Sequence, residues 1–175
     1  MSPMFTHGRL LVIGVMLVLA SPVVLADTIY QQPDDFVSQA FEGAPPKPRL
    51  LWLDAPAQQK LSAIFGHPYP QARLRYWRAD GRTAWVLEDT GKEYPITAGF
   101  VIVQGRIDRA SVLVYRETRG DEIHFPAFLR QFRGLALKDD GLSKEIDGIS
   151  GATLSVWAMQ RMARAALTLE AMAPP

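Results

Sequence analysis

The sequence predicts an α+β fold, with an antiparallel β meander, helices on one face and a long C-terminal helix. Three observations indicate this class. The middle of the chain carries alternating, β-branched stretches separated by short turn signals. The last part of the chain carries apolar residues at spacings of three and four, which is typical of an amphipathic helix. The chain is 48% hydrophobic and 21% charged, as an ordinary globular protein is, so disorder is not expected.

The first 26 residues have the three-part layout of a secretory signal peptide. A weakly positive start precedes an apolar run from Leu10 to Ala20, and the small residue Ala26 stands at the expected cleavage point. The alternative is a retained membrane anchor. Only the 17 residues from 10 to 26 lack charge, and Pro22 interrupts them, which falls short of the roughly 20 that a span needs. We therefore expect a mature chain that begins at Asp27.

The mature chain would hold 149 residues (175 minus 26), with 18 basic and 18 acidic side chains. The basic residues are scattered, whereas a nucleic-acid surface needs them clustered. The chain has no cysteine, which excludes a disulfide framework, a thiol nucleophile and a cysteine-ligated metal. A neutral, cysteine-free exported domain fits the bacterial periplasm.

Residues 27–72 are expected to form an N-terminal helical segment for which the sequence gives no functional signal. Apolar spacing predicts a short helix over 33–41 and a second helix over 56–65, each followed by a glycine. The remaining residues, 73–175, are expected to form the main domain.

Four strands are expected in the meander. Asp80-Gly81 is the strongest hairpin signal in the chain, and Gln104-Gly105 marks a second turn. The expected strands are Arg73–Ala79, Thr83–Asp89, Tyr94–Gln104 and Arg106–Thr118. A short amphipathic helix over 125–134, a polar connection with room for one short strand, and a long helix over 153–172 follow.

Small residues precede this last helix. Ser150 can cap it through its hydroxyl, while Gly151 and Ala152 leave the first free backbone N–H groups open. Such groups and the helix dipole together form an anion site, and the hydroxyl of Thr153 would lie beside it. From the residues alone, an ordinary helix start with a serine cap is the favoured interpretation.

The stretch DGISGATLS, at 147–155, resembles the flavinylation motif of the FMN-binding domain family. Members of that family occur in the Na⁺-translocating NADH:quinone reductase, in the Rnf complex and as small exported flavoproteins. The resemblance implies that Thr153 carries FMN through a phosphoester bond. It also implies that Ser150, Gly151 and Ala152 approach the cofactor and that Asp147 is the motif's acidic residue.

A second match lies upstream, where Glu117-Thr118 resembles a Glu-Thr pair at the end of a family strand. Arg119 replaces the proline expected next. The resemblance implies that Glu117 and Thr118 contact the flavin; the alternative is that they only finish a hairpin. Trp157, one turn beyond Thr153, could pack near the flavin, although most aromatic residues on helices belong to the core.

The resemblance further implies a partner enzyme. A threonine hydroxyl is a poor nucleophile and needs a base and an activated phosphate, which a Mg²⁺-dependent FAD:protein FMN transferase would supply. We therefore expect an electron carrier or redox subunit rather than a stand-alone enzyme, with a redox partner that could be a membrane reductase. The alternative is a non-enzymatic periplasmic binding module without flavin.

A hydrolase or a metalloprotein has little support. Ala152 stands where the second glycine of a G-x-S-x-G elbow belongs. The two histidines of the mature chain, His67 and His124, are far apart in sequence and have no recognised metal-ligand spacing.

N-terminal sequencing of exported material tests the signal peptide. We expect it to begin at Asp27, because the small residue before it fits signal peptidase cleavage. Recovery of a chain that begins at Met1 from a membrane fraction would favour the anchor instead.

Overall fold

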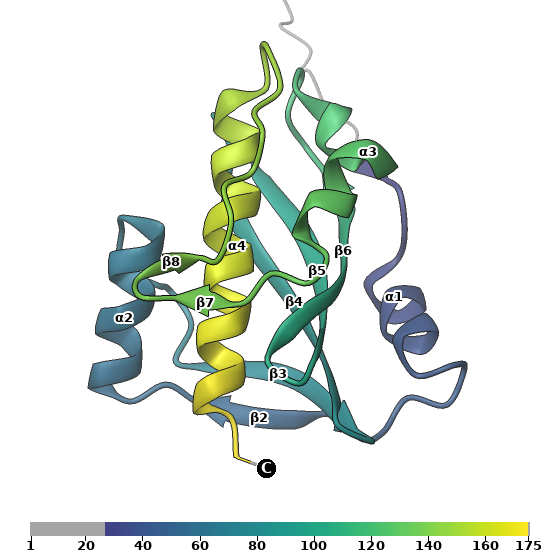
Figure 1. The fold of residues 1–175 in the computed structure, drawn as a ribbon, viewed down its shortest axis with the longest axis vertical. Helices are drawn as coiled ribbons and strands as arrows, with labels where there is room; N and C mark the ends of the chain where they lie inside the picture. The colour runs from purple at the N-terminus through teal and green to yellow at the C-terminus, as the bar shows by residue number, and fades with distance from the viewer. Residues whose placement is uncertain (1–26, 175) are drawn as a thin grey trace, which may run out of the picture.

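The computed structural model describes residues 27–174, so the expected signal peptide lies outside the described residues. Within 27–174 an antiparallel six-stranded sheet has the order β1-β6-β5-β4-β3-β2 (Figure 1). The strands of this sheet are β1 (Thr28–Ile29), β2 (Arg49–Trp52), β3 (Arg73–Ala79), β4 (Arg82–Thr90), β5 (Pro95–Val103) and β6 (Arg106–Tyr115). The α+β class and the antiparallel meander are confirmed.

Both predicted hairpin turns are present. Asp80 and Gly81 have φ of 50° and 71°, and Gln104 and Gly105 have φ of 50° and 72°. Two successive residues with positive φ are what a two-residue turn between twisted antiparallel strands requires. These turns set the register of β3 with β4 and of β5 with β6.

Strands β1 and β2 were not predicted. They come from residues 27–72 and extend the sheet at both edges, pairing with β6 and β3. Strand β1 has only two residues, and β2 buries only Leu51 among its four residues, so neither shows the alternation that identifies a strand in sequence. The segment 27–72 therefore contributes to the sheet as well as supplying helices.

Helices cover both faces of the sheet (Figure 1). Helices α2 (Ala55–Phe65) and α4 (Thr153–Met172) pack with the main core on one face, as expected. Helix α1 (Pro33–Ala40) differs from the expectation because it packs on the opposite face and closes a smaller core. That smaller core contains Phe36, Val37, Ala40, Ala84, Val101, Leu113 and Val114.

The segment between β6 and α4 is mostly short elements. These are η1 (Asp121–His124), α3 (Pro126–Leu129), η2 (Arg130–Phe132), β7 (Leu137–Lys138) and β8 (Gly141–Leu142). Phe128 and Phe132 bury their rings in the main core, and β7 and β8 lie against α4. Within 27–174, no helix combines the length and apolarity needed to cross a bilayer.

Charged contacts fix α4 to the sheet at its middle and near its C-terminal end. In the middle of the helix, Arg161 Nε lies 2.6 Å from Asp89 Oδ2, and the Asp89 side chain is only 1% exposed. Near the C-terminal end, the carboxylate of Glu170 accepts hydrogen bonds from Arg78, Thr83 and Trp85. A buried carboxylate is costly unless it is paired, so these contacts hold the helix at one position along the sheet.

Gly99 of β5 allows α1 to approach the sheet closely. A Cβ atom at this position would lie 2.6 Å from Cε1 and Cζ of Phe36, whose side chain is fully buried. We expect Gly99→Ala to lower the free energy of unfolding by about 1–3 kcal/mol, the usual cost of overpacking a core. Urea denaturation measures this change.

Gly148→Ala is the control, because an added Cβ there meets nothing within 4 Å. Gly148→Ala should not lower the free energy of unfolding. Combining Gly99→Ala with Phe36→Leu should cost less than the sum of the two single changes, since the smaller side chain relieves the clash. A Gly99→Ala protein as stable as the wild type would contradict the close contact.

Candidate functional site

Helix α4 begins at Thr153 without a side-chain cap. The N-cap residue is Ala152, and no side chain accepts a hydrogen bond there. The expectation that Ser150 caps the helix is therefore wrong. A backbone turn precedes the helix instead, in which Ala152 N donates to Ile149 O at 3.0 Å. Gly151 has φ of 85°, in the left-handed region that favours glycine.

The missing cap leaves the first turn of α4 with unsatisfied donors. Val156 N makes the first bond of the helix, to Ala152 O at 2.9 Å. The amides of Thr153, Leu154 and Ser155 precede it and have no acceptor within the helix. Their N–H groups stand at the positive end of the helix dipole, where an anion is favoured.

A cavity of about 270 Å³ lies beside this helix start. Its walls come from the β4–β5 turn, the loop after β6 and the first turn of α4. The lining residues are Lys92, Glu117, Thr118, Arg119, Gly151, Ala152, Thr153, Leu154 and Ser155. Thr153 is exposed, so its hydroxyl can be reached from outside.

Most of the residues expected at the site are thus brought together. Glu117 and Thr118 face the same cavity as Gly151, Ala152 and Thr153. Ser150 and Asp147 are exposed and do not line it. The backbone of Asp147 is held from another element, because its N–H donates to Gln131 Oε1 at 2.7 Å.

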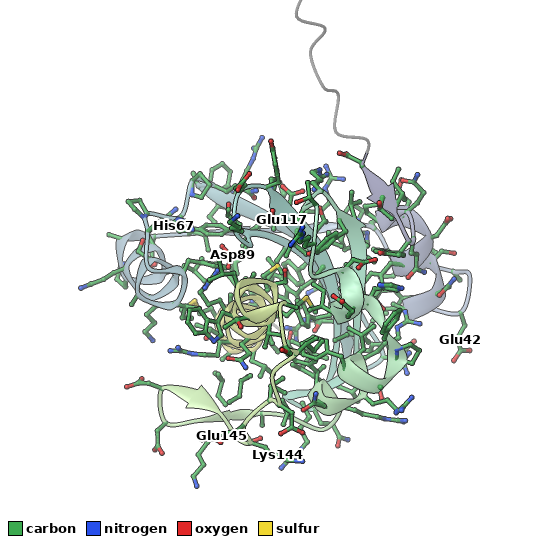
Figure 2. The ribbon with its side chains drawn as sticks, turned by 90° about the horizontal axis from the view of Figure 1, so that it is seen from above. Glu42, His67, Asp89, Glu117, Lys144 and Glu145 are labelled. Atoms are coloured by element: carbon green, nitrogen blue, oxygen red, sulfur yellow. The ribbon has the colours of Figure 1, made fainter. Side chains whose placement is uncertain are left out.

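Glu117 has a specific structural task in this site. Its Oε1 accepts hydrogen bonds from the backbone N–H groups of Lys92, Glu93 and Tyr94, at 2.5, 2.7 and 3.0 Å. In Figure 2, which looks down on the N-terminal end of α4, Glu117 lies on the same side of that helix as Asp89 and His67. Glu117 therefore fixes the β4–β5 turn, and with it the position of Lys92 at the cavity.

A buried hydroxyl pair joins the loop after β6 to α4. Tyr115 donates to Arg119 O at 2.5 Å, so the Ser155 hydroxyl donates to Tyr115 Oη at 3.0 Å. Burial raises the pKa of Tyr115, which keeps its hydroxyl neutral and able to donate. A Cβ on Gly120 would lie 3.0 Å from Ser155 Oγ, and its φ of 91° also favours glycine.

Sequence reasoning missed Lys92, Tyr115, Gly120 and Ser155. Lys92 lies in a turn far from the motif in sequence, and only the strand order brings it to the cavity. Ser155 was visible as a hydroxyl next to the motif, but its partner Tyr115 is on β6. For Trp157 the sequence left both a core position and a place near the flavin open, and its side chain is 51% exposed.

The donor set of the cavity fits a phosphate group. Lys92 and Arg119 supply positive charge, and the helix start supplies free amides. Such charge-assisted bonds to phosphate oxygens are stronger than neutral ones. The one acidic lining residue, Glu117, is engaged by three N–H groups, which offsets the repulsion its charge would exert.

Two other kinds of site, a metal site and a histidine-activated hydrolase site, find no support among the described residues. Among residues 27–174, no group of three or more potential ligand side chains could hold a metal ion. Neither of the two histidines within 27–174 lines the cavity. His67 Nε2 lies 3.6 Å from Asp89, and the His124 ring stacks on Tyr30, so neither of them is placed to activate Thr153.

Comparison with known proteins agrees with the geometry. The model of the FMN-binding domain family matches residues 91–168. No curated protein and no solved structure matches the chain. The matched range begins at the turn that Glu117 holds and includes every residue lining the cavity. An FMN-binding domain is therefore recognised over residues 91–168 of the 175-residue chain.

Proposed function

We propose that this protein is an exported electron-transfer flavoprotein that carries FMN on the hydroxyl of Thr153. One observation carries the proposal: an exposed threonine stands on the first turn of a helix, at the wall of a cavity with a phosphate-binding donor set. The family match supports FMN as the cofactor. The signal-peptide layout of the first 26 residues supports export to the periplasm.

The attachment reaction is a phosphoryl transfer from FAD. The oxygen of Thr153 forms a bond to the phosphorus of the FMN half, and the bond from that phosphorus to AMP breaks. AMP leaves, and the threonine proton passes to a base. The only carboxylate that lines the cavity is Glu117, whose Oε1 is committed to three N–H bonds of the β4–β5 turn. A separate Mg²⁺-dependent FAD:protein FMN transferase therefore supplies the base in this proposal.

The residues around Thr153 then hold the product. A phosphodiester keeps one negative charge, which Lys92, Arg119 and the free amides of the helix start favour. Thr118 adds a hydroxyl to the same wall. Asp147 and Ser150 are exposed and lie outside the cavity. In this proposal they are contacts for the transferase.

The bound flavin would supply the redox chemistry, and the protein would set its position and exposure. A covalent bond suits an exported carrier, because the cofactor cannot diffuse away. The redox partner in this proposal is a reductase, membrane-bound or soluble, that docks where the flavin is exposed.

Mass spectrometry of the intact, denatured protein tests the attachment. The wild type, exported together with a flavin transferase, should gain the mass of FMN less one water and should fluoresce as a flavin. Thr153→Ala should abolish the gain, because no other oxygen can replace the bridging atom. Thr168→Ala is the matched control, since it removes a threonine hydroxyl from the same helix at a position that does not line the cavity, and it should keep the full gain. A wild type without added mass would overturn the proposal.

Hydrogen exchange tests the role of Glu117. Replacing it by alanine removes the acceptor shared by three amides, and bonds to a charged group are worth about 1.5–3 kcal/mol. We expect exchange at Lys92 and Tyr94 to accelerate at least about tenfold in Glu117→Ala. Glu93→Ala is the control, because that carboxylate pairs only with the exposed Lys92 side chain. Unchanged protection in Glu117→Ala would show that the turn holds itself.

A further inference from the structure

Helix α4 exposes two large apolar side chains next to Thr153. Leu154 is 40% exposed and Trp157 is 51% exposed. Most of the other apolar residues of this helix are buried against the sheet and α2, so the exposure is confined to its first turns. Water solvates an indole ring poorly, so such a patch commonly marks a place where another group packs.

Trp157 differs from the other tryptophans, all of which lie within 27–174. Trp85 stacks on Tyr76, Trp77 packs against the smaller core, and Trp52 lies under the guanidinium of Arg73. In the described part of the chain, Trp157 has no ring contact, cation contact or hydrogen bond. Its ring is therefore available to a group that the fold itself does not supply.

The spacing of Trp157 and Thr153 places this ring near the attachment oxygen. Residues four apart lie on the same side of a helix, about 6 Å apart along its axis. Helical side chains also lean toward the N-terminus, so the Trp157 ring covers the turn that holds Thr153. Leu154 belongs both to this surface and to the lining of the cavity.

The cavity alone suits only part of the cofactor. Its lining is mostly polar or small, which fits a phosphate and a hydroxylated chain. Leu154 is the only large apolar side chain among the lining residues, so a flat three-ring system lacks an apolar wall there. The next apolar surface along the helix is Trp157. One turn beyond it, Arg161 is paired with Asp89.

We propose that Trp157, with Leu154, is the platform on which the isoalloxazine ring of the flavin packs. This inference rests on the proposed attachment of FMN to Thr153. An offset stack of two aromatic systems covers one face of each ring and leaves the other face of the flavin toward solvent. Trp157 is thus a positioning residue that presents the flavin to a redox partner.

Flavin fluorescence of the holoprotein tests the platform. Stacking on an indole quenches flavin emission, and a typical aromatic contact favours the stacked arrangement about two- to tenfold. We expect Trp157→Ala to raise the flavin emission per bound flavin at least about twofold over the wild type. Trp157→Phe, which keeps an aromatic ring, should fall between the two. The visible circular dichroism of the flavin should weaken in the same order.

Trp52→Ala is the matched control, because Trp52 is 66% exposed but lies on β2 and not on α4. It should leave the flavin emission at the wild-type level. Tryptophan emission gives a second reading: it should be lower in the flavinylated wild type than in Thr153→Ala, and this difference should shrink in the Trp157→Ala background.

Intact mass separates the two proposals. If the wild type does not gain the mass of FMN, the proposed function fails. If the wild type and the Trp157 variants gain it and Trp157→Ala emits as the wild type does, only the platform is wrong. Loss of the mass gain in Trp157→Ala alone would assign the residue to transferase docking and overturn the platform. Sedimentation of the flavin-free protein tests whether the patch is instead a contact between two copies of the chain. A dimer that becomes a monomer in Trp157→Ala would assign the patch to that contact and would overturn the platform.

Discussion

The docking of α4 on the sheet is the constraint on which the rest of the site depends. The contact between Asp89 and Arg161 joins a buried carboxylate on β4 to a guanidinium two turns after Thr153. An uncompensated charge at this depth would be costly, so the helix cannot slide without breaking the pair. The partly buried Glu170 fixes the C-terminal end of the helix through three further hydrogen bonds. The position of Thr153 relative to the sheet follows from these contacts.

The cavity walls are loops, yet each loop is tied to a rigid element. Glu117 gathers the three N–H groups of the β4–β5 turn, and Tyr115 with Ser155 joins the loop after β6 to the first turn of α4. Functional groups on loops gain precision when a scaffold holds them this way. These contacts hold the N–H donors and cations around the cavity in fixed positions, and a preorganised site reduces the ordering cost of binding.

The site has a polar surface and an apolar surface, and the proposed flavin has a part that matches each of them. The polar cavity, with its cations and free amides, suits the charged end of the molecule, and the exposed apolar start of α4 suits the ring. Helix α4 joins these surfaces, because Leu154 belongs to both. Local exposure of apolar groups lowers the solubility of a protein, so a patch at this position fits a role in binding.

The sequence by itself determined the elements that depend on short-range signals. Asp80-Gly81 and Gln104-Gly105 specify turns through their own φ preferences, and the apolar spacing of 153–172 specifies a helix that begins at the motif threonine. Only the tertiary structure decided the rest. Lys92 and Tyr115 reach the site through strand pairing between distant segments, and Trp157 is exposed because the sheet buries other sides of α4. Ser150 could have capped the helix by composition, but the turn closed by Ile149 and Ala152 leaves Ala152 at the N-cap position, without a side-chain cap. Local propensity acts between neighbours in the chain, whereas the walls of a cavity are set by contacts between residues that are distant in sequence.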